Sequence, residues 1–188
     1  MAVIGFALTG SFCSLKKAFE PLKVLAENHT VIPIVSERVA QTDTRFLPAS
    51  ETLETLKKIC GRDALQSIAD CEPIGPKKLL DLLVICPSTG NTLAKTALGI
   101  TDSSVTMAYK AHRRNGRPVL FGVSTNDGLS GSARNIGALL NTRGNFFVPF
   151  SQDEPLEKPA SLVCDFSLLP MAVEAALQGE QLQPMLQG

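Results

Sequence analysis

The chain has 188 residues, of which 44% are hydrophobic, enough for one domain with a sizeable buried core. Lysine plus arginine equals aspartate plus glutamate at 18 each, so no net charge attracts nucleic acid, an anionic membrane surface or a strongly charged partner. We therefore expect a small-molecule ligand.

The cysteines and histidines limit the chemistry further. Five cysteines, an odd number without paired short spacings, and no signal peptide ahead of them predict a reduced, cytoplasmic protein. His29 and His112 lie far apart in sequence and are interpreted as surface residues, so a metal site is not expected. No apolar stretch approaches the roughly 20 residues that a membrane-spanning helix needs.

Apolar runs bounded by turn residues predict strands, and apolar residues recurring three and four apart predict helices. In the first part of the chain these patterns predict a strand at 2–9, a helix at 15–28, a strand at 31–35, a long polar loop at 37–50, and helices at 50–60 and 63–69. The segment Pro73-Ile74-Gly75-Pro76 should exclude regular structure.

The second part of the chain continues the alternation. It predicts a strand at 79–86, a loop at 87–92, a helix at 93–98, a helix from 102 or 103 to 114, a strand at 118–123, a helix ending near 140, a strand at 146–148, a charged loop at 151–159 and a helix at 167–177. This order indicates an α/β fold, a doubly wound, Rossmann-like (flavodoxin-like) parallel sheet with helices on both faces. Residues 1–180 should form a single domain, with 181–188 as a tail.

Four predicted strands end in small hydroxyl residues: Thr9-Gly10-Ser11, Ser36, Ser88-Thr89 and Ser124-Thr125. In an open α/β sheet those ends share one edge, where ligands bind. Hydroxyl groups and the backbone amides of the first turn of a helix, which have no partner within the helix, can bind a phosphate. Any one Ser or Thr is better explained as a helix cap, so the prediction depends on the set. Neither G-x-G-x-x-G nor a P-loop lysine is present.

Three further segments carry polar groups near this edge. In Pro87 to Thr92, followed by Lys95, Asn91 offers a donor and an acceptor that would suit a planar heterocycle, or it forms a tight turn. Thr44-Arg45-Phe46 places a fork of donors beside an apolar ring, which could bind a dicarboxylate or cover a ring system; alternatively Arg45 is an exposed loop residue and Phe46 fills an edge of the core. Asn126-Asp127 either contacts a substrate or, more commonly, forms a turn.

Together these segments resemble a known family. Thr9-Gly10-Ser11, Ser36, Pro87 to Thr92, Lys95 and Thr101-Asp102-Ser103 resemble the flavoproteins that include the homo-oligomeric, flavin-containing cysteine decarboxylases. The segments 43–46, 73–76, 126–127, 148–155 and 181–184 narrow the resemblance to members that take part in forming dipicolinate in spore-forming bacteria.

The chain also departs from the decarboxylases. Those proteins carry a catalytic histidine near the segment that here reads Pro73 to Pro76, and a Pro-Ala-Met-Asn loop where this chain has Val123-Ser124-Thr125-Asn126. Cysteine decarboxylation is therefore disfavoured, and the substrate must differ.

The resemblance implies oxidation of a dihydro- or hydroxytetrahydrodipicolinate from the lysine/diaminopimelate pathway to dipicolinate, in the mother-cell cytoplasm during sporulation. It implies a homo-oligomer, with FMN as cofactor and a second subunit that binds NAD(P). Arg45 and Asn126 would contact the dicarboxylate, and FMN would contact Thr9, Gly10, Ser11, Ser36, Pro87, Ser88, Thr89, Asn91, Thr92, Lys95 and Ser124. The alternative is a non-catalytic assembly subunit that keeps the fold and a phosphate site.

Overall fold

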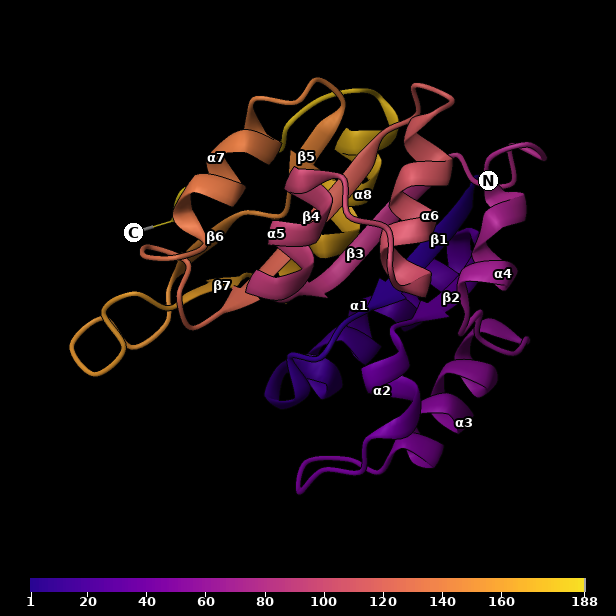
Figure 1. Ribbon diagram of the computed structural model, residues 1–188, viewed down its shortest axis with the longest axis horizontal. Coiled ribbons are helices and arrows are strands. Elements are labelled where there is room, and N and C mark those ends of the chain that lie inside the picture. Colours follow the sequence, from indigo (N-terminus) through magenta and orange to yellow (C-terminus); the bar gives the residue numbers. More distant parts are fainter. Residues whose placement is uncertain (188) are drawn as a thin grey trace.

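The computed structural model describes residues 1–187, and within them a seven-stranded sheet is covered by helices on both faces (Figure 1). The strands are β1 (Val3–Leu8), β2 (Thr30–Val35), β3 (Leu82–Ser88), β4 (Val119–Thr125), β5 (Asn145–Phe147), β6 (Phe150–Gln152) and β7 (Leu162–Cys164). Their order is β2-β1-β3-β4-β7-β6, and β5 pairs with β4. The first five strands pair in parallel, whereas β7 is antiparallel to β4 and β6. The predicted fold class is confirmed.

The helices form two layers. Helices α5, α6 and α7 cover the face of the sheet nearer the viewer in Figure 1, and α1 and α8 cover the other. The bounds are α1 (Leu15–Asn28), α2 (Glu37–Gln41), α3 (Ala49–Cys60), α4 (Ile68–Cys71), α5 (Gly90–Leu98), α6 (Ser104–Arg113), α7 (Ala133–Leu140) and α8 (Leu169–Leu177), with short 3-10 helices at Phe12–Ser14, Glu72–Ile74 and Phe166–Leu168.

The core follows from this two-sided covering. A strand buried on both faces needs apolar residues at successive positions, and every residue of β3 is buried. Phe6, Phe121 and Phe147 are fully buried, and the rings of Phe121 and Phe147 stack with centroids 5.3 Å apart. Each such side chain contributes about 1.5–3 kcal/mol by leaving water.

The predicted loop at 37–50 is partly wrong. It begins with α2, because the Ser36 hydroxyl accepts a hydrogen bond from the Val39 amide and so caps a helix. The next helix begins at Ala49, one residue before the predicted start, where the Asp43 carboxylate accepts a hydrogen bond from the Ala49 amide.

The segment around Pro73 also differs from the prediction. The helix expected at 63–69 begins only at Ile68, after a capping box between Ser67 and Asp70. The chain then continues as a 3-10 helix over Glu72–Ile74, because a proline in the first turn of a helix lacks only an amide that would have no partner there.

Other boundaries shift around β3 and the last strands. Pro87 and Ser88, expected in a loop, are the last residues of β3, and α5 begins at Gly90 rather than 93. Strands β6 and β7 have three residues each, too short to show a periodic pattern. The backbone atoms of Phe150 bond to Met185 and Gln187, so part of segment 181–187 runs beside β6.

His112 corrects another expectation. It is 1% exposed rather than a surface residue, because its Nε2 donates a hydrogen bond to the Pro118 carbonyl, 2.8 Å away, under the start of β4. Within residues 1–187, no helix is both long and apolar enough to cross a membrane. The same residues contain no cluster of three or more His, Cys, Asp or Glu suited to a metal ion.

Candidate functional site

Two adjoining hollows lie at the carboxyl edge of the parallel strands. The first, of about 700 Å³, is lined by Thr9, Gly10, Phe12, Ser36, Glu37, Arg38, Thr42, Thr89, Asn91, Thr92, Lys95, Asp102 and Ser103. The second, of about 740 Å³, is lined by Gly10, Ser11, Phe12, Cys13, Ser14, Lys17, Arg45, Phe46, Thr89, Gly90, Ser124, Thr125, Asn126, Asp153, Glu154, Lys158, Ser161, Leu162 and Val163. Gly10, Phe12 and Thr89 line both, so the hollows meet at the ends of β1 and β3.

The first hollow is built around the start of α5. Thr89 caps this helix, with its hydroxyl accepting a hydrogen bond from the Thr92 amide at 3.3 Å and lying 3.1 Å from the Thr92 hydroxyl. The positive end of the helix dipole therefore lies at the hollow, together with the side chain of Asn91. This end of a nine-residue helix favours an anion.

Thr9 fixes the connection between β3 and α5. Its hydroxyl donates to the Pro87 carbonyl at 2.7 Å and accepts from the Thr89 amide at 3.1 Å. Pro87 and Ser88 lie inside β3 and are absent from the lining of both hollows. The buried Ser88 hydroxyl has no hydrogen-bond partner within residues 1–187.

The far wall of the first hollow carries charges. Lys95, one turn into α5, forms an ion pair with Asp102 at 2.8 Å. Glu37 accepts a hydrogen bond from the Ser104 amide at 2.9 Å and so holds the start of α6 against α2. Glu37, Arg38 and Asp102 were not predicted as site residues; a helix start directly after Ser36 was the signal that would have indicated the first two.

A chain of hydroxyls forms the floor of the second hollow. The Ser124 hydroxyl lies 2.8 Å from that of Ser11 and 2.9 Å from that of Ser14. The structure thus brings together Ser11 and Ser124, which were predicted, and adds Ser14, which was not. Because each hydroxyl can donate or accept, this floor can adapt to either kind of ligand atom.

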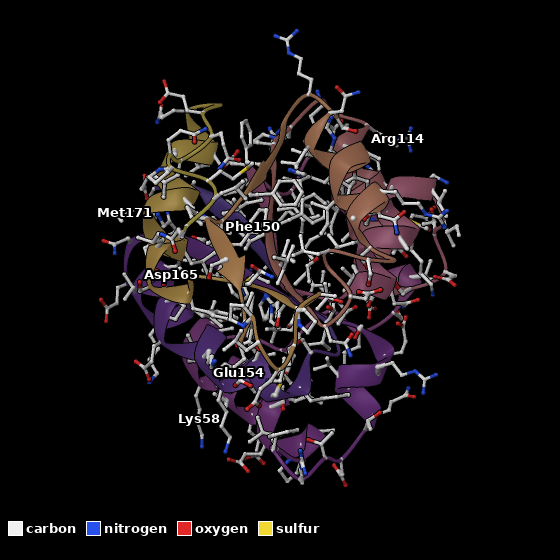
Figure 2. The ribbon with its side chains drawn as sticks, turned by 90° about the vertical axis from the view of Figure 1, so that its left-hand side faces the viewer. Lys58, Arg114, Phe150, Glu154, Asp165 and Met171 are labelled. Carbon is white, nitrogen blue, oxygen red and sulfur yellow. The ribbon has the colours of Figure 1, made fainter. Side chains whose placement is uncertain are left out.

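Two loops form the walls of the second hollow. Arg45 and Phe46 come from the connection before α3, with the guanidinium carbon 4.8 Å from the ring centroid. Phe46 is 39% exposed, so it is not the core residue that one interpretation of this segment expected. On the other side, between β6 and β7, Lys158 lies 3.0 Å from Glu154 and 3.5 Å from Asp153, and Figure 2 shows Glu154 on this connection.

The loop that follows β4 packs against the start of α5, beside the second hollow. Asp127 accepts hydrogen bonds from the hydroxyls of Thr125 at 2.6 Å and Ser132 at 2.8 Å. A Cβ atom on Gly90 would lie 2.5–2.9 Å from these three side chains. Only a glycine therefore lets the loop and the helix approach this closely, while Asn126 remains exposed to the hollow.

The comparison with known proteins agrees with this geometry. A family model described as Flavoprotein matches residues 2–165. The chain belongs to the flavoprotein family.

Two relatives in this family share high identity with the chain. The B subunit of dipicolinate synthase from Bacillus subtilis (strain 168) is 45% identical over 184 residues, which cover 97% of this chain and 92% of that protein. The crystal structure of the B subunit of dipicolinate synthase from Bacillus halodurans C is 43% identical, with a TM-score of 0.91, and the match covers 100% of this chain and 96% of that one.

A more distant structure shares the fold alone. The FMN-dependent cysteine decarboxylase SpaF is 19% identical, with a TM-score of 0.71, over 94% of this chain and 97% of that one. Neither histidine of this chain lines the two hollows.

Proposed function

We propose that this chain is the FMN-binding subunit of a two-subunit enzyme that oxidises a dihydro- or hydroxytetrahydrodipicolinate to dipicolinate during sporulation. Its partner, the A subunit of dipicolinate synthase, would bind NAD(P). The observation that carries this proposal is the pair of joined hollows, one with a helix start and hydroxyls for a phosphate, the other with a hydroxyl floor beside Arg45.

The donors of the site fit FMN. Each hollow lies within the range of about 300–1,000 Å³ that small-molecule sites occupy, and together they allow an elongated ligand. The phosphate would lie at the start of α5 beside Thr89 and Ser36, because the hydroxyls and helix dipole favour an anion there. Gly10 leaves space at the junction, where a Cβ would have no contact shorter than 3.7 Å.

The second hollow would bind the substrate. Arg45 can hold a carboxylate with two parallel hydrogen bonds, and Asn126 offers both a donor and an acceptor. Bound FMN would supply a two-electron acceptor next to the substrate ring, the NAD(P)+ of the partner subunit would take up the two electrons, and a hydroxytetrahydro substrate would also lose one molecule of water. The protein residues would orient the ring and hold its carboxylates, and the β6–β7 connection would restrict water at the open side of the hollow.

The test is dipicolinate formation by the two subunits assembled from a flavin-free preparation of this chain, with and without added FMN. We expect added FMN to raise the rate by about tenfold or more if the flavin takes part in the reaction. Equal rates with and without FMN would overturn the proposal and support a non-catalytic assembly role. The isolated partner is the control for its own activity.

A further inference from the structure

The second hollow carries two cations that have no acidic partner. Its lining contains five charged residues: Lys17, Arg45, Asp153, Glu154 and Lys158. Lys158 lies 3.5 Å from Asp153 and 3.0 Å from Glu154, so both acids of the hollow are paired with this lysine. Lys17 and Arg45, by contrast, form no ion pair within residues 1–187. Two cations are therefore left free for a ligand.

The two free cations are supported by different elements. Lys17 is the third residue of α1, whereas Arg45 lies in the connection between α2 and α3. The Thr44 hydroxyl holds that connection, because it accepts hydrogen bonds from the amides of Phe46 and Leu47, both at 3.2 Å. Because the two cations come from separate supports, they can hold two separate anionic groups of one ligand.

The position of Lys17 is not explained by the stability of its helix. The start of a helix favours acids, yet the first turn of α1 has no acid and includes Lys17. A cation at this end of the helix dipole costs about 0.3–1 kcal/mol at an exposed position. Lys17 is also absent from the lining of the first hollow, where the FMN phosphate is proposed to bind. An anionic group bound in the second hollow would offset the cost.

We propose that Lys17 binds the second carboxylate of the substrate while Arg45 holds the first, so that the site selects a ring with a carboxylate on each side of its nitrogen. This inference rests on the proposed function, because it takes the dicarboxylate as the occupant of the second hollow. The two carboxylates of such a ring point away from each other, so a single cation cannot pair closely with both. Lys17 is thus a specificity-determining residue.

The pair of cations discriminates by what it leaves unpaired. A ring with one carboxylate would form a charge-assisted hydrogen bond with only one of them. The other cation would lose part of its water to the bound ring without gaining a partner, which penalises the wrong ligand. The hydroxyl floor of Ser11, Ser14 and Ser124 makes no such distinction, because each hydroxyl can donate or accept.

The test compares two ligands, dipicolinate and picolinate, which is the same ring with one carboxylate. Their binding to the chain is measured by isothermal titration calorimetry, with and without FMN. We expect the wild type to bind dipicolinate about tenfold or more tightly than picolinate. In Lys17→Met the affinity for dipicolinate should fall to about that for picolinate, and the affinity for picolinate should stay the same.

Lys23→Met is the matched control, since Lys23 is an exposed lysine further along α1 that lines neither hollow. It loses the same charge and should keep the wild-type preference for dipicolinate. FMN affinity should be the same in all three proteins.

Equal binding of the two ligands by the wild type, or an unchanged preference in Lys17→Met, would overturn the role of Lys17. A loss of FMN affinity in Lys17→Met, with the preference intact, would place Lys17 at the cofactor instead and overturn it too. The proposed function is separable from these outcomes. FMN-dependent dipicolinate formation together with an unchanged preference in Lys17→Met would leave the function standing, whereas a lost preference in a chain that binds no FMN would leave only the dicarboxylate site.

Discussion

The proposal that the substrate is a dicarboxylate depends mainly on Arg45. Its guanidinium lies over the Phe46 ring at the second hollow, and no acid within residues 1–187 forms an ion pair with it. Arg45→Ala should raise the KM of the assembled enzyme for its dicarboxylate by about tenfold or more, because an arginine–carboxylate pair is lost, while FMN affinity stays the same. Steady-state kinetics and FMN titration measure the two effects separately.

Arg62→Ala provides the control for this substitution, since Arg62 is an exposed arginine that lines neither hollow. Its kinetics should match those of the wild type. An unchanged KM and kcat in Arg45→Ala would remove Arg45 from the substrate site.

His112 predicts a dependence of stability on pH. Burial lowers its pKa from 6.5 to about 4, so the folded chain keeps the ring neutral where the unfolded chain protonates it. The free energy of unfolding should therefore fall as the pH drops from about 6.5 to about 4, by about 3 kcal/mol from this residue. Urea unfolding at a series of pH values measures it. In His112→Gln, which keeps a donor for the Pro118 carbonyl, this part of the slope should disappear; an identical slope would contradict the assignment.

At this scale the sequence predicted most of the hydroxyls of the site and two of its charged residues, Lys95 and Arg45, but not the other charged residues. Thr9, Ser36 and Thr89 were predictable because each follows an apolar strand, and strand ends share an edge. Asp153, Glu154 and Lys158 were not, because only the pairing of β6 with β7 brings their loop to the second hollow. His112 looked like a surface residue because a polar residue on a helix gives no sign of a buried carbonyl partner.

Helix α5 depends on its contact with the loop after β4. Gly90→Ala would place a Cβ 2.5 Å from the Ser132 hydroxyl and 2.7 Å from Asp127, which are hydrogen-bonded to each other and cannot move apart freely. We expect this variant to lower the free energy of unfolding by about 1–3 kcal/mol, as overpacking does. It should also weaken FMN binding, because the helix start shifts. Denaturant unfolding and FMN titration measure the two effects.

Gly137→Ala in α7 is the control, since a Cβ there has nothing within 4 Å. It should leave stability unchanged or raise it by about 0.5–1 kcal/mol through helix propensity. If Gly90→Ala were as stable as Gly137→Ala, the close approach at α5 would not be as described.

The elements themselves were predictable where their burial was regular. Strands β1 to β4 are apolar runs and helix α1 has a clear three-and-four pattern, so the sequence predicted them with small boundary shifts. Strands β6 and β7 were missed because a strand of three residues carries no period and forms only by pairing at the end of β4. The start of α5 was placed late because Gly90 and Asn91 favour turns outside this context.

At the scale of the whole molecule, net charge gave an incomplete prediction. Equal numbers of acids and bases argued against a strongly charged partner, but that argument holds only for charges that are mixed over the surface. Here residues 103–152 are basic and residues 153–188 contain six acids against one lysine. Figure 2 shows Arg114 and Met171 on opposite sides of the molecule, so the basic helical layer lies away from α8.

The measurement that tests the central claim most directly is titration of the flavin-free chain with FMN, followed by visible absorbance and flavin fluorescence, for the wild type, Gly10→Leu and Gly137→Leu. Gly10→Leu places a side chain where the two hollows meet, and Gly137→Leu adds the same side chain in open space. We predict saturable binding by the wild type and Gly137→Leu, and affinity lower by about tenfold or more in Gly10→Leu. Absence of FMN binding by the wild type, or equal affinity in all three proteins, would contradict a flavin site at this edge of the sheet.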